Sequence, residues 1–546
     1  MDPEKIHRRR WLILGVLALS VFLVVVDNTI VNVALPTLSR ELDASISELQ
    51  WIVDAYALVF AGLLLLGGAL GDRVGRKGAM QVGLVIFGAM SLMGALSTST
   101  VQLIAARGAM GIGAALVFPA TLAILTNVFT EPVERAKAIG AWAAVSGLAV
   151  AFGPIVGGFL LEHYSWSSVF YVNIPIVLVA LVAGAFLLPT SRDPGAGRFD
   201  VLGTLLSIAG VGLLVFTVIE GPRWGWGSAA TIGGFVASAA LLVAFVLWEL
   251  RATKPLIDVR VFRIPRFSAA AISVAVAFFC LFGFVFMVTQ YFQFVKGYST
   301  LSAGVHTLPF AVFVAVTAPI AARLALRFGP RPIIGSGLVA IAAGLFLAST
   351  FSASTSYWGP VIVSMALLAT GLALVTTPAT EAVMSSLPRE QAGAGAAVND
   401  VTRELGGTLG VAVVGSVFAS VYGPKLADQL SSLPIPAEAL GPAKESVAAA
   451  LEVAAQAPEA AQATISQAAS TAFMDGMTAG SFVAACVAVA GAVAVFVFMP
   501  RRRDHAVENV IDLRDDSADI DLRDSTLAAR DAAAPAAEVA DAPIEA

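Results

Sequence analysis

Long apolar runs separated by short polar segments cover most of the 546-residue chain. A helix needs about 20 apolar residues to cross roughly 30 Å of hydrocarbon. The runs do not alternate apolar and polar positions, so they favour helices over barrel strands. We expect fourteen transmembrane helices, at 12–34, 51–70, 79–96, 101–125, 138–161, 169–188, 201–219, 230–247, 268–292, 304–324, 332–350, 357–377, 405–421 and 477–498. The pattern therefore predicts an all-α membrane protein.

Composition supports lipid as the main solvent of the chain. Apolar residues make up 58% and charged residues 13% of the sequence, whereas soluble domains carry about 25% charged residues. Cys280 and Cys486 lie within apolar runs, and the four histidines are scattered. These residues form neither a disulfide framework nor a metal or catalytic cluster. We therefore expect no enzyme activity, no metal and no cofactor.

The Lys and Arg residues fix the expected orientation. With the N-terminus inside, 27 of the 33 Lys and Arg residues fall in inner loops, in tails or, for Arg323, at the inner end of a span. Arg107 lies deeper within a span, and the other five lie in outer loops. This asymmetry predicts that both termini are cytoplasmic. The excess of Arg over Lys, together with the Ala-rich composition, suggests a bacterial cytoplasmic membrane.

Two halves of the chain resemble each other. Phe118-Pro119-Ala120-Thr121 near the end of span 4 is echoed by Thr377-Pro378-Ala379-Thr380 near the end of span 12. Repeated bundles around a central site are typical of secondary transporters. The expected organisation is a cytoplasmic N-terminus (1–11), a six-helix bundle (12–188), two inserted helices with linkers (189–267), a second six-helix bundle (268–499) with an extracytoplasmic loop (422–475), and a disordered acidic cytoplasmic tail (500–546).

Three ionisable residues occur inside the predicted spans of the first bundle. Asp27 ends an apolar run, with Asn28 and Asn32 close by, while Asp54 and Arg107 lie near the starts of spans 2 and 4. At 1.5 Å per residue, Asp27, Asp54 and Arg107 occupy the outer halves of their spans. An intramembrane Arg costs at least about 2.5 kcal/mol unless it faces a carboxylate or a cavity. These residues are candidates for proton coupling and substrate binding; a static ion pair that only holds helices together stays open.

Two glycine-containing motifs are candidates for conformational change. The loop after span 2 combines turn glycines with charges that we assign to gating: Gly68, Asp72, Arg73, Gly75, Arg76 and Lys77. Span 5 carries small residues and a proline that permit a kink and close helix packing: Gly147, Gly153, Pro154, Gly157 and Gly158. For span 5, a purely structural kink is the open alternative.

These motifs together resemble the major facilitator superfamily, and in particular its fourteen-spanner drug:proton antiporter family, the EmrB/QacA-like group. The resemblance covers residues 10–500. It implies alternating access of two bundles, with a proton gradient in place of a cofactor. Under it, Arg107 couples to protons, Asp27 to protons or cationic substrate, and Gly153-Pro154 to the antiport direction. Asp72 is expected to close the cytoplasmic side by capping the amino end of span 13.

The sequence thus predicts proton-coupled efflux of hydrophobic or amphipathic drugs or toxic metabolites, cationic ones among them. The expected partners are these small molecules, protons and the bilayer. The charge pattern shows no nucleic-acid footprint, and a monomer is the expected state. Two alternatives stay open. One is a dedicated exporter of a single endogenous product such as an antibiotic or lipid, and the other is a membrane sensor that transports nothing.

Overall fold

The structure is a computed structural model that describes residues 3–191, 200–252, 259–386, 392–431 and 437–500. Every regular element in this described part is a helix. From residue 501 on, the predicted acidic tail lies outside the described residues, so its predicted disorder stays a prediction.

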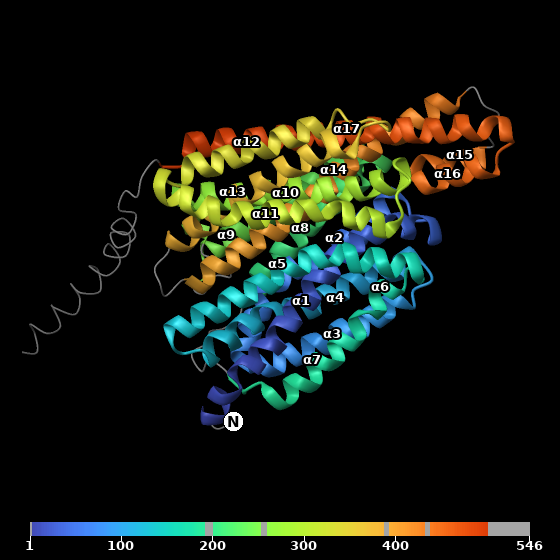
Figure 1. Cartoon of the computed structure of the whole chain (residues 1–546). Helices are drawn as coiled ribbons and strands as arrows, with labels where there is room; N and C mark the ends of the chain where they lie inside the picture. Colours follow the sequence, from blue (N-terminus) through green and yellow to red (C-terminus); the bar gives the residue numbers. More distant parts are fainter. Residues whose placement is uncertain (1–2, 192–199, 253–258, 387–391, 432–436, 501–546) are drawn as a thin grey trace, which may run out of the picture.

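The first half forms one bundle, the lower one in Figure 1. Its helices are α1 (Pro3–Glu41), α2 (Ile46–Val74), α3 (Arg76–Ala95), α4 (Thr100–Val128), α5 (Pro132–His163), α6 (Ser168–Tyr171) and α7 (Asn173–Leu187). The first helix is longer than the predicted span 12–34 because Pro36 is accommodated inside it, and the helix ends only at Glu41.

Two inserted helices follow, α8 (Val201–Trp224) and α9 (Ala229–Glu249), and then the short η1 (Val259–Arg263). The second bundle contains α10 (Pro265–Gln290), η2 (Tyr291–Val295), α11 (Thr300–Phe328), α12 (Pro330–Ala348), η3 (Tyr357–Val361), α13 (Ile362–Ser385), α14 (Ala392–Leu430), α15 (Ala437–Glu445), α16 (Val447–Gln456) and α17 (Glu459–Phe498). The predicted extracytoplasmic loop 422–475 is largely helical, and α15 and α16 project past the other helices at one end of the molecule (Figure 1).

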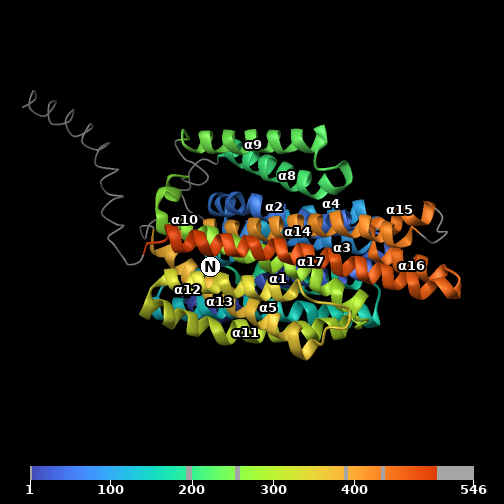
Figure 2. The same cartoon turned by 90° about the horizontal axis from the view of Figure 1, so that it is seen from above.

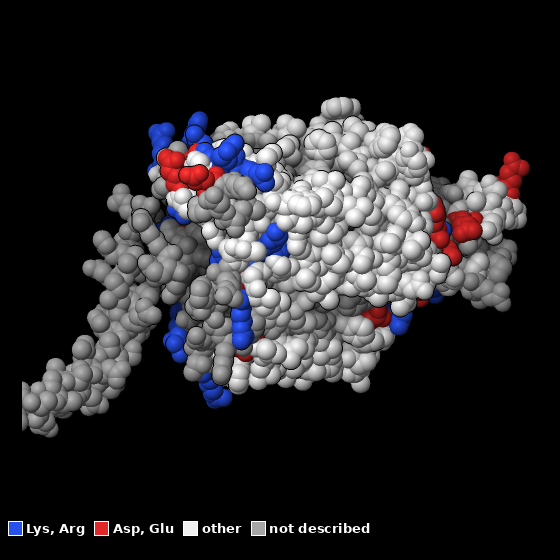
Figure 3. Space-filling model, turned by 90° about the horizontal axis from the view of Figure 1, so that it is seen from below, with Lys and Arg blue, Asp and Glu red and all other residues white. Residues whose placement is uncertain are grey.

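Thirteen described helices are long and apolar enough to cross a membrane. Helix α5 adds a shorter apolar stretch, Leu148–His163, within its 32 residues. Helix α5 occupies the place of the remaining predicted span, although its apolar stretch is shorter than those of the other thirteen. The all-α fold class is confirmed. On the face seen in Figure 3, Lys and Arg gather toward one end together with some acidic residues, other acidic residues lie toward the opposite end, and a wide uncharged band lies between them. Such a band suits a hydrocarbon environment.

The two bundles meet along two seams. One seam packs α2 against α14, and the other packs α5 against α11. The α8–α9 hairpin lies on the outside of the first seam, where α8 contacts both α2 and α14 (Figure 2). Ser416 of α14 donates to the Val218 carbonyl of α8 at 2.8 Å, and Trp51 of α2 lies 5.9 Å from Phe216. The inserted helices therefore brace one seam from the lipid side.

Candidate functional site

A buried ion pair lies at the centre of the first bundle. The Arg107 guanidinium of α4 donates from Nη1 to Asp27 Oδ2 of α1 at 2.5 Å, and both side chains are 0% exposed. Arg107 Nε also donates to the Ile52 carbonyl of α2 at 3.1 Å. The guanidinium carbon lies 4.3 Å from the Tyr56 ring centroid, close enough for a cation–π contact. Arg107 of α4 therefore connects its helix to both α1 and α2.

Close helix packing creates this arrangement. Gly111, one turn after Arg107 on α4, lies so near α2 that a Cβ there would be 2.7 Å from the Tyr56 carbonyl. Small residues let two helix backbones approach in this way. The approach brings Arg107 within reach of both the α2 backbone and the α1 carboxylate. The structure therefore brings together two of the three ionisable residues that the sequence places in the outer halves of their spans.

Sequence reasoning missed the polar residues that complete the site. Asn173 Nδ2, at the start of α7, donates to Asp27 Oδ1 at 2.8 Å and lies 3.0 Å from the Ser91 hydroxyl of α3. Ser91 in turn donates to the Phe170 carbonyl at 2.9 Å. Both Asn173 and Ser91 are fully buried. The only sequence signal was a single amide at the entry to span 6, and amides are common near helix starts.

Asp54 does not join this ion pair. Gln50, one turn earlier on α2, donates to the Val411 and Ala412 carbonyls of α14 at 3.2 and 2.8 Å. Residues four apart share a helix face, so Asp54 lies on the side of α2 that packs against α14. Arg107 contacts a different side of the same helix. Asp54 is fully buried, and neither carboxylate oxygen has a hydrogen-bond partner among the described residues.

Asn28 and Asn32 lie one turn apart on α1, and the Asn32 side chain forms a hydrogen bond within that helix. Asn32 Nδ2 donates to the Asn28 carbonyl at 3.0 Å. The Oδ1 atoms of both side chains are buried and have no hydrogen-bond partner among the described residues. Each amide therefore keeps a free acceptor in the interior of the bundle.

The loop between α2 and α3 is held inside the first bundle. Gly75 adopts φ +125°, a backbone conformation that L side chains rarely reach, which permits the sharp turn. Asp72 accepts from Arg76 Nε at 2.6 Å, and Arg76 also donates to the Ala123 carbonyl at 3.3 Å. Lys77 donates to the Ala185 carbonyl at 2.7 Å. Asp72 thus binds Arg76 here, and its expected cap of span 13 stays a prediction because residues 387–391, which precede α14, lie outside the described residues.

The remaining loop residues lie at the surface or against α4. Gly68 faces Pro119, where an added Cβ would stand 3.4 Å from the proline Cβ. Arg73 is exposed at the end of α2. The loop thus places one glycine against a neighbouring helix and leaves one basic side chain outside the bundle.

The glycines of α5 face two different helices. At Gly153 and Gly157 a Cβ would collide with Thr29 and Ile30 of α1. At Gly158 it would lie 2.6 Å from the Leu301 Cα of α11, across the seam. Pro154 lies in the same seam, and its carbonyl fills the space beside Gly304. Gly147 is within α5, but its surroundings lie outside the described residues.

Hydrogen bonds between the two bundles cluster at one end, which we call the outer end because the Lys and Arg pattern predicts it to face outside. Ser39 of α1 and Ser446 next to α16 have their hydroxyls 3.0 Å apart. Gln293 of η2 donates to the Val33 carbonyl at 3.0 Å. Together with the Gln50 bonds and the α5–α11 contacts, these close the outer end. Within the described part of the chain, no hydrogen bond joins the bundles at the opposite end.

At the opposite, inner end, α1 is tied to the start of α5. Arg10 donates to Glu134 Oε1 at 2.9 Å. This hydrogen bond, assisted by the positive charge of Arg10, lowers the pKa of the Glu134 carboxyl below its ordinary value. Both members of the pair belong to the first bundle.

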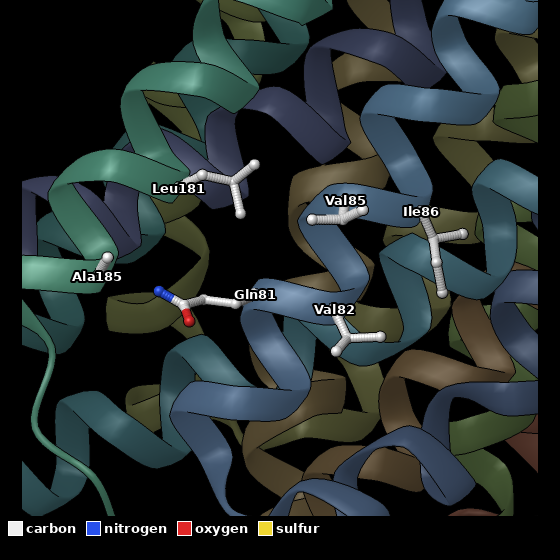
Figure 4. A pocket seen from close by; sticks show the side chains of 6 residues that line it. All are labelled: Gln81, Val82, Val85, Ile86, Leu181 and Ala185. Atoms are coloured by element: carbon white, nitrogen blue, oxygen red, sulfur yellow. The ribbon is translucent and has the colours of Figure 1, made fainter.

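One surface groove lies away from the ion pair. It runs between α3 and α7 on the outside of the first bundle (Figure 4), and Val82 and Val85 in it are 54% exposed. Its lining is almost entirely apolar: Gln81, Val82, Val85, Ile86, Leu181 and Ala185. A lipid tail suits such a surface. The buried ion pair therefore stays the candidate site.

Membrane-length helices in two bundles, with a buried charge pair in one of them, define a secondary transporter. No cluster of three potential metal ligands is present among the residues that the structure describes. The family model described as the Major Facilitator Superfamily matches residues 17–411. The chain belongs to this superfamily, as the sequence motifs predicted.

Three curated relatives each match three quarters or more of the chain. The "Multidrug efflux pump LfrA" of Mycolicibacterium smegmatis is 34% identical over 90% of this chain and 97% of its own length. The "Tetracenomycin C resistance and export protein" of Streptomyces glaucescens is 36% identical over 89% of this chain and 91% of its own. The "Methyl viologen resistance protein SmvA" of Salmonella typhimurium strain LT2 is 37% identical over 76% of this chain and 83% of its own length.

A solved structure shares the fold. The bacterial homolog of the human lysosomal transporter Spinster superposes with a TM-score of 0.64 at 19% identity, covering 91% of this chain and 98% of that one. Transporter bundles of this kind need no catalytic centre. Family membership and fold together indicate a transporter rather than an enzyme.

Proposed function

We propose that the chain exports hydrophobic or amphipathic drugs or toxic metabolites, cationic ones among them, across the bacterial cytoplasmic membrane in exchange for protons. The observation that carries this proposal is the buried pair of Asp27 and Arg107, with a second buried acid, Asp54, unpaired nearby. Intramembrane ionisable groups mark proton and ion pathways by default. The relatives named for drug efflux and resistance support the direction of transport.

The two acids have different roles in this proposal. Asp27 is already compensated by Arg107 and Asn173, so its negative charge is stable while the site is dry. Asp54 has no such partner, and a buried carboxylate without one favours its neutral form. Asp54 therefore carries the proton in the conformation described. Opening the α2–α14 seam would bring water to Asp54 and let the proton leave or return.

Cationic substrate competes with Arg107 for Asp27. A cation near the carboxylate replaces part of the attraction that Arg107 supplies, and the released guanidinium repels positive charge, including protons. The amide oxygens of Asn28 and Asn32 provide polar contacts in an otherwise apolar bundle. Recognition by a few polar groups and a large apolar surface is typical of small-molecule sites.

Alternating access fits the contacts between the bundles. In this conformation the outer end is closed by hydrogen bonds and close glycine contacts, and substrate would enter from the inner side. The cycle requires these outer contacts to break while the inner loop motif, with Asp72, Arg73 and Arg76, forms contacts with the second bundle. We propose cytoplasmic termini and a monomeric transporter, since each chain carries both bundles.

Export of one endogenous product is the second candidate function. The likeness to a tetracenomycin C resistance and export protein favours it. A panel of dyes and antibiotics in a host that lacks its own efflux pumps separates the two. Protection against chemically diverse compounds supports the broad exporter, whereas protection against a single class supports the dedicated one.

Transport itself is tested with inside-out membrane vesicles from cells that express the chain. Drug accumulation should follow an imposed pH gradient and stop when a protonophore is added. Vesicles with the Asp54→Asn variant are measured alongside and should lose uphill accumulation. Full accumulation by Asp54→Asn would remove the proposed proton carrier.

A further inference from the structure

We propose that Glu162 is the latch of the outer gate: its carboxylate holds the amino end of α11 while the outer end is closed and must release it when the outer end opens. The inference rests on alternating access in the proposed function. It assigns a role to an acid outside every motif discussed above. Glu162 lies in the last turn of α5, in the first bundle, whereas α11 belongs to the second.

The contact uses the exposed amide end of a helix. Glu162 Oε2 accepts from the Leu301 backbone N–H at 3.3 Å and from the Ser299 hydroxyl at 3.1 Å. The first N–H groups of a helix have no partner within the helix. Ser299 is the cap residue of α11, and its hydroxyl also accepts from Ser302 N–H at 3.2 Å. A residue of one bundle thus completes the helix cap of the other.

Electrostatics favours a carboxylate at this point. The amino end of a helix carries a partial positive charge, and a negative side chain there contributes about 0.3–1 kcal/mol at an exposed site. Helix α11 runs for 29 residues from Thr300 to Phe328. Glu162 is exposed, so salt will weaken the attraction. An interaction of this size can bias an equilibrium and still be broken in every cycle.

Neighbouring backbone contacts show that the latch exists only when the helices are close. The Thr300 hydroxyl donates to the Gly158 carbonyl at 3.1 Å. An added Cβ at Gly158 would lie 2.7 Å from the Thr300 carbonyl, and Gly304 faces the Pro154 carbonyl across the same seam. Any separation of α5 from α11 therefore breaks the Glu162 contacts as well. The Glu162 carboxylate therefore keeps its contacts with α11 only while the α5–α11 seam is closed.

The open population can be measured at a separate outer contact. Ser39 is 3% exposed and lies against Ser446, on different helices from the latch. We would introduce Ser39→Cys into a chain whose own cysteines are replaced by Cys280→Ala and Cys486→Ala. A membrane-impermeant maleimide, added from outside to intact cells or to the purified chain in nanodiscs, then labels position 39 in proportion to the open population.

Removing the latch charge should speed labelling. We expect Glu162→Gln to raise the labelling rate about two- to fivefold, the equivalent of the helix-end term above. Glu162→Ala, which also loses both hydrogen bonds, should raise it further. In high salt the difference between wild type and Glu162→Gln should shrink. Glu131→Gln, an exposed glutamate just before the other end of α5, is the control and should leave the rate unchanged.

Unchanged labelling in both Glu162 variants would overturn the latch. An equal rise in the Glu131→Gln control would overturn it too, since the effect would then be general loosening. The measurement needs neither substrate nor a proton gradient. If the chain shows no proton-driven transport but the Glu162 variants change the labelling rate as expected, only the proposed function is contradicted.

Discussion

Asp27→Asn leaves the positive charge of Arg107 without its negative partner in the interior of the first bundle. The substitution preserves the size of the side chain and an oxygen for the Asn173 amide. It removes the negative charge that faces Arg107 Nη1 at 2.5 Å. Arg107 is 0% exposed, and its remaining contacts are the Ile52 carbonyl and the Tyr56 ring. Neither contact neutralises a full positive charge.

The expected destabilisation is about 3–5 kcal/mol, the range for breaking a buried pair by removing one partner. Arg107→Gln should show a similar loss because Asp27 is then left uncompensated. The double variant Asp27→Asn/Arg107→Gln should lose clearly less than the sum of the two, since neither charge remains. Equilibrium unfolding in mixed micelles gives the free energy of unfolding for all four chains, and the double-mutant cycle gives the coupling.

Transport measured on the same four chains separates a coupling role from a static one. We expect Asp27→Asn and the double variant to fold and to have lost proton-driven efflux. Proton-driven efflux by the double variant would show that the pair only holds helices together. Single variants that lose less than about 1 kcal/mol, as exposed pairs do, would refute the reasoning about burial.

Three further predictions follow from local geometry. Gly153→Ala should destabilise the chain by about 1–3 kcal/mol through overpacking against α1, whereas Gly15→Ala, with nothing within 4 Å of its Cβ, should not; thermal unfolding of both tests this. Gly75→Ala should lose about 1–3 kcal/mol because φ is +125°, and Gly78→Ala three residues later serves as its control. The hydrogen bond from Arg10 lowers the pKa of Glu134. The stabilisation by this hydrogen bond is therefore present above the ordinary Glu pKa and is lost as pH falls through the lowered pKa. The melting temperature of Glu134→Gln should accordingly depend less on acid pH than that of the wild type.

The helical framework was predictable because membrane-length apolar runs leave few structural options. The runs predicted helices rather than strands, and the repeat between the halves predicted two bundles. Helix ends were less predictable: α1 continues through Pro36 to Glu41, and α14 and α17 extend far beyond their apolar cores. Outside the hydrocarbon, hydropathy no longer limits helix length.

The candidate site was only partly predictable. An intramembrane Arg needs a carboxylate or a cavity, so its cost predicted a polar partner for Arg107 but did not choose between Asp27 and Asp54. Which side of α2 Asp54 occupies depends on how the two bundles pack, and depth along the span says nothing about that. Asn173 and Glu162 act through contacts between distant helices, and neither carries a local sequence signal that sets it apart.

Uphill export from purified proteoliposomes tests proton exchange most directly. Vesicles loaded with a lumenal pH dye and a fluorescent amphipathic cation are given an inward-directed pH gradient. We predict that the cation leaves against its concentration difference while the lumen acidifies faster than in protein-free vesicles. Both signals should vanish in Asp27→Asn and when protonophore and ionophore collapse the pH gradient and the voltage. Uphill export at an unchanged rate after that collapse would contradict the account.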